Sequence, residues 1–303
     1  MPTPALPTTA ELPARYELVR ELGAGLSGRA FLALDRESRV RVVVKRYHLG
    51  GPNDAPPAVL RAHYEKLLRL PAHAALCGVR AFETDEQGPY AVLEYVTGRP
   101  LTKLRARIER HARRRKSEHP SAARDRRRLD LLLTAIDGVL DGLRTLHEAG
   151  IAHGDCRSGN LIWARGRIVL IDYDRLLNRE GLDEQDFRRA CADDLSELGE
   201  GLVELARSIS PLATLDRDPQ GIPLAYGRAG RVECRVAALA CVLHELANAG
   251  DAAQDGPDYT VAAQARSGDP ARLRALRRTV ARALLAKLPP RPGWVHPLPL
   301  LAA

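Results

Sequence analysis

Four short strings in the chain carry residue types that could together handle the phosphate groups of a nucleotide. In chain order they are GAGLSG (residues 23–28), VVK (43–45), HGDCRSGN (153–160) and LIDYD (170–174). Phosphoryl transfer needs a cation on the phosphates, oxygen ligands for Mg²⁺ and a carboxylate that accepts the proton of the incoming hydroxyl. The strings supply each of these groups, so the chemistry that they indicate is phosphoryl transfer.

The elements that would position these strings can be predicted from residue periodicity. Alternating or β-branched runs predict strands at residues 16–22, 30–34, 40–46, 78–84 and 89–95, with the glycine string joining the first two. Pro56 and Pro57 suit the opening of a helix that continues to Leu70, because proline is tolerated in a first turn.

The second half of the chain changes from strand-like to helix-like patterns. Apolar residues recur at helical spacing from Leu132 to Leu146 and predict one long buried helix face. Short strands are expected at residues 161–163 and 168–171, and helix and loop from about residue 192 onward. We therefore expect an α+β fold in which a small antiparallel-sheet lobe precedes a helical lobe.

The expected domain organisation has three parts. Residues 1–14, rich in Pro, Thr and Ala, are expected to be a flexible tail, residues 15–95 the sheet lobe, and residues 96–303 the helical lobe. There is no N-terminal signal pattern, and the most apolar stretch, residues 237–243, is too short to cross a bilayer. The five cysteines are scattered and odd in number, which argues against a disulfide framework or zinc site. We therefore expect a soluble, cytoplasmic protein without a transmembrane segment.

The net charge of +8 is concentrated in one stretch. Residues 105–128 contain eleven Lys or Arg against three acidic residues, a difference equal to the whole excess. This basic insert is expected to be either a solvated, partly helical arm or a docking surface for an anionic partner. The stretch has no aromatic residue to stack on bases, which argues against recognition of single-stranded nucleic acid.

The four strings, in this order and spacing, resemble those of the eukaryotic-type protein kinase superfamily, from about residue 16 to residue 206. The resemblance implies a two-lobed protein-kinase-like fold that binds ATP and Mg²⁺. In it, Gly23, Gly25 and Gly28 form the glycine-rich loop, where the absence of side chains lets backbone N–H groups approach the phosphates. Lys45 would grip the α- and β-phosphates, and Glu65, twenty residues on, would be its partner on the next helix.

The resemblance also assigns roles in the rest of the chain. Residues 93–96 would form the hinge that reads adenine, with Glu94 and Val96 as binding residues. Asp155 would be the catalytic base, Asn160 and Asp172 the magnesium ligands, and Asp194 a buried helix anchor that braces the catalytic loop. Arg157 takes the place of the usual catalytic-loop lysine and keeps its positive charge.

The roles of Asp174 and His153 are not assigned by the resemblance and are predicted from the residues themselves. Asp174 follows Asp172 by two residues, so in an extended backbone both carboxylates point the same way and could share the metal; the alternative is a cap of the following turn. His153 is expected to support its loop through hydrogen bonds.

The acceptor is the least determined part of the prediction. Only 21 residues separate Asp172 from Asp194, and they contain no Ala-Pro-Glu string, which leaves little room for a peptide platform. The expected function is a Ser/Thr protein kinase-like phosphotransferase that uses a hydroxyl acceptor. The alternatives are a kinase for small molecules or lipopolysaccharide sugars, which the string at residues 170–175 also resembles, and a nucleotide-binding pseudokinase.

Overall fold

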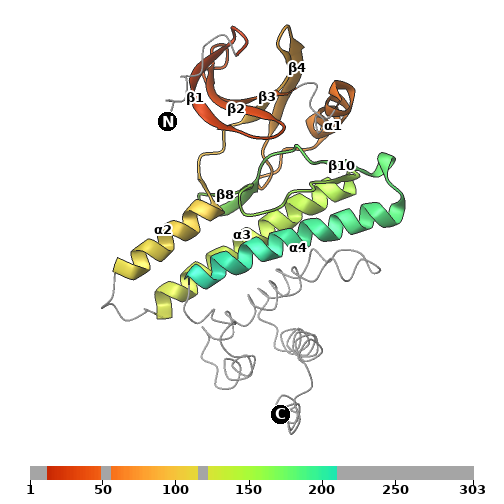
Figure 1. Ribbon diagram of the computed structural model, residues 1–303. Coiled ribbons are helices and arrows are strands. Elements are labelled where there is room, and N and C mark those ends of the chain that lie inside the picture. The colour runs from red at the N-terminus through yellow and green to blue at the C-terminus, as the bar shows by residue number, and fades with distance from the viewer. Residues whose placement is uncertain (1–11, 49–55, 115–121, 210–303) are drawn as a thin grey trace.

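The computed structural model describes residues 12–48, 56–114 and 122–209 of the 303-residue chain. These residues form two lobes, a twisted antiparallel sheet with one helix and a larger part built on three long helices (Figure 1). The expected α+β, two-lobed fold is confirmed. The expectations for residues 1–11 and 210–303 lie outside the described residues.

The small lobe is a five-stranded sheet in the order β1-β2-β3-β5-β4, with every neighbouring pair antiparallel. One of its faces packs around Phe31, Val42, Val44 and Tyr90, which are all buried, as the alternation of the strands requires. Leu12 is 7% exposed and belongs to this cluster, so the ordered lobe begins within the segment expected to be a flexible tail. The strands are β1 (Tyr16–Ala24), β2 (Gly28–Asp35), β3 (Arg41–Tyr47), β4 (Val79–Asp85) and β5 (Gly88–Glu94).

Helix α1 (Pro57–Arg69) packs against β4. Its buried residues are Leu60, Tyr64 and Leu67, which recur at intervals of four and three and so share one face of the helix. A proline occupies the first turn, as the sequence indicated.

The large lobe contains α2 (Leu101–Arg114), α3 (Ala122–Glu148) and α4 (Glu184–Ile209), which lie side by side (Figure 1). The predicted apolar face of α3, from Leu132 to Leu146, lies in the main core. Helix α4 begins eight residues before the expected start of the final helical region. Short elements connect the helices: β6 (Arg99–Pro100), β7 (Ile151–Ala152), β8 (Leu161–Ala164), β9 (Arg167–Leu170), β10 (Leu177–Asn178) and the 3₁₀ turn η2 (Arg179–Gly181).

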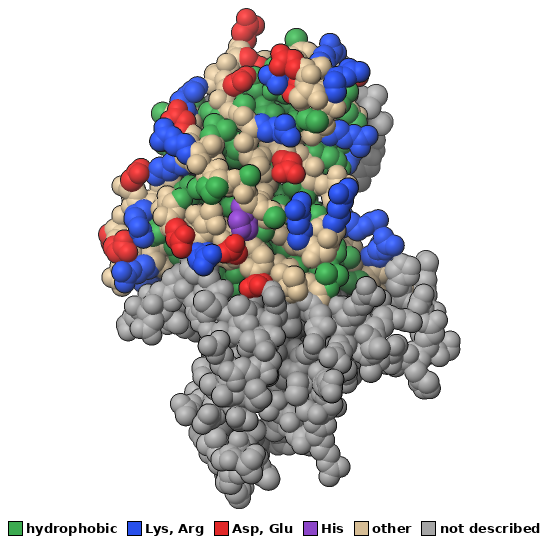
Figure 2. Space-filling model, turned by 180° about the vertical axis from the view of Figure 1, so that it is seen from behind, with side chains coloured by type: hydrophobic (Ala, Val, Ile, Leu, Met, Phe, Trp, Pro, Cys, Tyr) green, Lys and Arg blue, Asp and Glu red, His purple; other side chains and the backbone are tan. Residues whose placement is uncertain are grey.

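The basic insert belongs to the helical framework where it is described. Its backbone continues α2 as far as Arg114 and resumes in α3 at Ala122. On the face drawn in Figure 2, acidic and basic side chains of the described residues are interspersed. In the described part of the chain, none of the helices combines the length and the apolar character needed to cross a membrane.

Candidate active site

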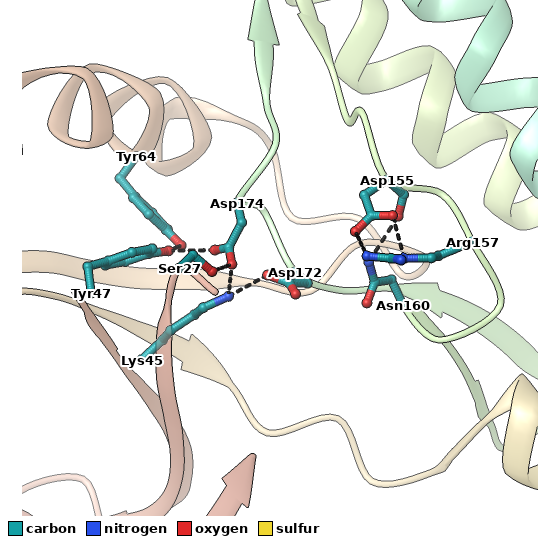
Figure 3. A network of polar contacts seen from close by, with 9 residues as sticks. All are labelled: Ser27, Lys45, Tyr47, Tyr64, Asp155, Arg157, Asn160, Asp172 and Asp174. Carbon is teal, nitrogen blue, oxygen red and sulfur yellow. Dashed lines mark hydrogen bonds and ion pairs between the residues drawn. The ribbon is translucent and has the colours of Figure 1, made fainter. Parts of the chain in front are cut away.

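Lys45 of the small lobe and Asp172 of the large lobe are in contact. Lys45 lies on β3, between Ala30 of β2 and Ala91 of β5, so its backbone is fixed by ladders on both sides. Its Nζ atom lies 2.5 Å from Oδ1 of Asp172, which follows β9 in the large lobe (Figure 3). Lys45, which is predicted to bind the phosphates, and Asp172, which is predicted to bind the metal, are therefore neighbours.

The backbone at Asp172 adopts an uncommon conformation. Its φ is +73°, in the left-handed region that few residues other than glycine occupy. Such conformations are found where the surroundings impose them, often at functional sites. Burial raises the pKa of Asp172, while the charge of Lys45 acts in the opposite direction.

Asp174 turns its carboxylate toward the small lobe. Its Oδ2 atom is contacted by Lys45 Nζ and Ser27 Oγ, and its Oδ1 atom accepts a hydrogen bond from the Tyr47 hydroxyl at 3.1 Å. Burial acts to raise the pKa of Asp174, but the charge and hydrogen bond of Lys45, together with Ser27, lower it. The role predicted for Asp174 as a metal ligand stays a prediction, and these contacts point to a different one.

Asp155, Arg157 and Asn160 form the second cluster of the site (Figure 3). The guanidinium of Arg157 meets the Asp155 carboxylate twice, with Nε 2.6 Å from Oδ1 and Nη2 2.8 Å from Oδ2. Asn160 Nδ2 donates to the backbone oxygen of Asp155 at 3.0 Å. Because its amide nitrogen is engaged there, the amide oxygen of Asn160 is the atom available to a metal.

Asp194 of α4 holds the loop that carries Asp155. Its carboxylate accepts hydrogen bonds from the backbone N–H groups of His153 and Gly154, both at 2.7 Å, and from the ring Nε2 of His147 at 2.9 Å. Burial acts to raise its pKa, but these hydrogen bonds and the histidines lower it. The structure therefore shows the helix anchor that the resemblance implied.

His153 supports the loop through the hydrogen bond of its backbone N–H to Asp194, whereas its ring contributes by packing. Neither of its ring nitrogens has a hydrogen-bond partner among the described residues, and the ring is fully buried. It packs at a centroid distance of 5.6 Å from the ring of Tyr173. Burial lowers the pKa of His153, so the ring acts as a neutral packing group.

Sequence reasoning missed Glu197, whose Oε2 accepts the backbone N–H of Cys156 at 2.6 Å. The signal that could have found it is its place three residues after Asp194, on the same side of a helix. It also missed Ser27, Tyr47 and Tyr64, which carried no signal because their contacts join distant segments.

The expected pair of Lys45 with Glu65 is not formed. Glu65 is exposed, and the partners of Lys45 Nζ are Asp172 and Asp174. The reason is the phase of α1: its buried face includes Tyr64, and the next residue in a helix points about 100° away.

The three glycines of the loop differ in what surrounds them. An added Cβ at Gly23 would meet nothing within 4 Å, and at Gly25 only the Gly28 carbonyl oxygen at 4.0 Å. At Gly28 it would lie 1.9 Å from the carbonyl oxygen of Arg46, so this glycine is required by the packing of β2 on β3. Only Gly23 and Gly25 keep open the space that phosphates would enter.

The segment predicted to bind adenine, residues 93–96, comprises the last two residues of β5 and the two that follow it. The Glu94 backbone N–H donates to Gly78 at 2.8 Å, and its carbonyl oxygen lies 3.4 Å from the Cys77 thiol. Val96 is partly buried and packs against the main core. The adenine-binding roles of Glu94 and Val96 stay predictions.

The donor set fits a magnesium nucleotide. Asp172 and Asn160 offer the hard oxygen ligands that Mg²⁺ prefers, Lys45 offers a cation, and Gly23 and Gly25 leave open space beside the glycine-rich loop. No other ion is needed to account for these side chains.

Comparison with known proteins agrees with this geometry. A family model described as the protein kinase domain matches residues 16–181. The putative cyclin-dependent kinase F-2 of Oryza sativa subsp. japonica is 30% identical over 166 residues, which cover 52% of this chain and 46% of that protein.

Two bacterial proteins are also similar to this chain. Serine/threonine-protein kinase PknD of Chlamydia trachomatis serovar D is 24% identical over 190 residues, covering 59% of this chain and 19% of that protein. Serine/threonine-protein kinase PksC of Streptomyces coelicolor is 29% identical over 167 residues, covering 52% and 27%. The chain spans less than half the length of each of these three relatives.

Proposed function

The chain belongs to the protein kinase family, and on that premise we propose that it is an ATP- and Mg²⁺-dependent phosphotransferase with a hydroxyl acceptor. The observation that carries the proposal is the 2.5 Å contact between Lys45 Nζ and Asp172 Oδ1. It places a cation from one lobe beside a carboxylate from the other, where phosphate charge needs to be neutralised.

The proposed roles follow from the atoms that each residue offers. Lys45 binds the α- and β-phosphates, and the backbone of the glycine loop approaches them from the other side. Asp172 and Asn160 would hold Mg²⁺, which supplies charge neutralisation on the phosphates when bound. Asp155 accepts the proton of the acceptor hydroxyl, and Arg157, which now covers it, would turn toward the transferring phosphoryl group.

A Ser or Thr hydroxyl of a protein is the first acceptor that we propose. The relatives whose names state a substrate class are serine/threonine-protein kinases. The family model of the protein kinase domain matches residues 16–181, which include Lys45, Asp155, Asn160 and Asp172. Asp155 is held by backbone hydrogen bonds of its loop to Asp194, so its position does not depend on a bound substrate.

A small-molecule hydroxyl is the second candidate, because one observation favours it. The chain between Asp172 and Asp194 folds into β10, η2 and the first turns of α4, which begins at Glu184. Only residues 175–183 lie between the LIDYD string (170–174) and α4, and this segment is short for a peptide to lie on. A compact sugar or metabolite needs no such platform.

The experiment that separates these candidates uses ATP labelled in its γ-phosphate. The purified chain is incubated with Mg²⁺ and with cell extract divided into a protein pool and a small-molecule pool. Label in the protein pool supports a protein kinase, and label in the other pool supports a metabolite or glycan kinase. No label in either pool, beside measurable ATP binding, would contradict both and favour a pseudokinase.

Two further proposals concern partners and location. The charge of residues 105–128 supports an anionic partner whose binding weakens as salt rises, because exposed charges are screened over about 8–10 Å at physiological ionic strength. The reducing cytoplasm is the proposed location. It is supported by the three cysteines of the described part, Cys77, Cys156 and Cys191, which are all free and buried.

A further inference from the structure

Asp174 joins the large lobe to three side chains of the small lobe. Lys45 and Ser27 contact its Oδ2 atom, and Tyr47 donates to its Oδ1 atom. Figure 3 shows these side chains converging on the Asp174 carboxylate. Lys45 and Tyr47 belong to β3, and Ser27 lies in the glycine loop between β1 and β2. One carboxylate therefore ties both Lys45 and the glycine loop to the LIDYD string (170–174) of the large lobe.

The Lys45–Asp174 pair is shielded from water. The two side chains are 10% and 14% exposed. A charge removed from water needs an opposite charge and hydrogen bonds in return, and breaking such a pair leaves the other charge unpaired. An ionised carboxylate has about four acceptor sites, and the three contacts to Asp174 occupy most of them. The Lys45–Asp174 contact is therefore a largely buried ion pair and not a surface contact.

Helix α1 contacts the side chains around Asp174 through the neutral hydroxyl of Tyr64. Its buried residue Tyr64 places a hydroxyl 2.5 Å from the Tyr47 hydroxyl, while Glu65 faces outward. Burial raises the pKa of both Tyr47 and Tyr64, so both phenols keep their protons at neutral pH. The negative charge beside Lys45 thus comes from the large lobe.

The residue before Asp174 is anchored as well. Tyr173 is 2% exposed, and its hydroxyl donates to the Cys77 carbonyl at 2.8 Å. Asp172 on the other side contacts Lys45. Because the segment is held at three successive residues, Asp174 has little freedom to turn away from the small lobe.

We propose that Asp174 is the positioning residue of Lys45, in place of a glutamate on helix α1, and that it closes the glycine loop through Ser27. This inference rests on the proposed function, since it takes Lys45 to act on the phosphates of a nucleotide. Its consequence is that the negative charge that orients Lys45 comes from the large lobe and not from helix α1.

The test is a double-mutant cycle on nucleotide affinity. The dissociation constant of a fluorescent ATP analogue is measured in Mg²⁺-free buffer for the wild type, Lys45→Met, Asp174→Asn and the double variant. Each single change should weaken binding by about tenfold or more, as expected when a charge-assisted contact is lost. The double variant should have about the same affinity as the single variant that binds the analogue less tightly, because both changes break the same pair.

Three comparisons make the cycle decisive. Asp174→Glu should recover part of the affinity, because it restores the carboxylate. A second cycle pairs Lys45→Met with Glu65→Gln. The inference would be overturned if the losses of affinity from Lys45→Met and Asp174→Asn multiply while those from Lys45→Met and Glu65→Gln do not. It would also be overturned by an effect of Asp174→Asn that appears only when Mg²⁺ is added, since that is the behaviour of a metal ligand.

A structural role and a failure of the proposed function can also be told apart. If Asp174→Asn lowers the melting temperature but leaves analogue affinity at the wild-type value, the positioning role is wrong. If the wild type binds no analogue, the proposed function fails, and the pair is judged from the melting temperatures of the same four proteins without nucleotide. Shifts smaller than additive support the pair, and additive shifts overturn it.

Discussion

Asp155 and Arg157 form a two-pronged ion pair in which both carboxylate oxygens of the proposed base are covered by one guanidinium. The side chain of Asp155 is 10% exposed and that of Arg157 is 65% exposed. The carboxylate is therefore fixed in its loop, while the arginine has room to move. We therefore expect Arg157 to be the member that moves if the pair opens for an acceptor.

The first prediction concerns that movement. Arg157→Ala should lower turnover roughly tenfold to a hundredfold, because a cation near the transferring phosphoryl group is lost. Arg157→Lys should lower it less, since the charge stays while the planar fork is lost. Steady-state rates at saturating ATP measure both effects. A rise in turnover for Arg157→Ala would show that the arginine only blocks the base.

The second prediction separates two kinds of glycine in one loop. Gly28→Ala should lower the free energy of unfolding by about 1–3 kcal/mol, because its Cβ would meet the Arg46 carbonyl oxygen. Gly25→Ala should keep stability within about 0.5 kcal/mol and instead weaken ATP binding. Urea unfolding and nucleotide titration of both variants test this. Equal losses of stability would contradict the distinction.

The third prediction concerns acid sensitivity of the small lobe. Hydrogen bonds from Arg15 hold the pKa of Asp35 well below its usual range. A group with a lowered folded-state pKa stabilises the protein above its unfolded value, near pH 4, and the contribution is lost as pH falls toward the folded pKa. The stability difference between wild type and Asp35→Asn should therefore be largest near neutral pH and shrink below about pH 4. Urea unfolding at pH 7 and pH 3 measures it, and a difference that is the same at both would contradict the assignment.

Local patterns were enough to predict much of the fold. The alternation of apolar residues located the five strands of the sheet, and the spacing from Leu132 to Leu146 located the buried face of α3. These features depend on neighbours in sequence, so the sequence records them directly. The same holds for Lys45, whose strand is defined by the apolar run that precedes it.

The contacts of Asp174 could not be predicted in this way. Ser27, Lys45 and Tyr47 lie 127 or more positions earlier in the chain, so their meeting depends on how the lobes pack. The error at Glu65 had a local cause. The spacing of Leu60, Tyr64 and Leu67 sets the phase of α1 and turns Glu65 outward, whereas position along the helix alone does not distinguish Glu65 from Tyr64.

In the proposed mechanism, the chain transfers the γ-phosphoryl group of ATP with Asp155 as the base. The most direct measurement compares the rate of phosphoryl transfer from labelled ATP by the wild type and by Asp155→Asn, with and without Mg²⁺, after checking that both bind ATP and melt at similar temperatures. We expect Mg²⁺-dependent transfer by the wild type and a rate at least about a hundredfold lower for the variant. Equal rates for the two proteins, or no transfer by a wild type that binds ATP, would contradict it.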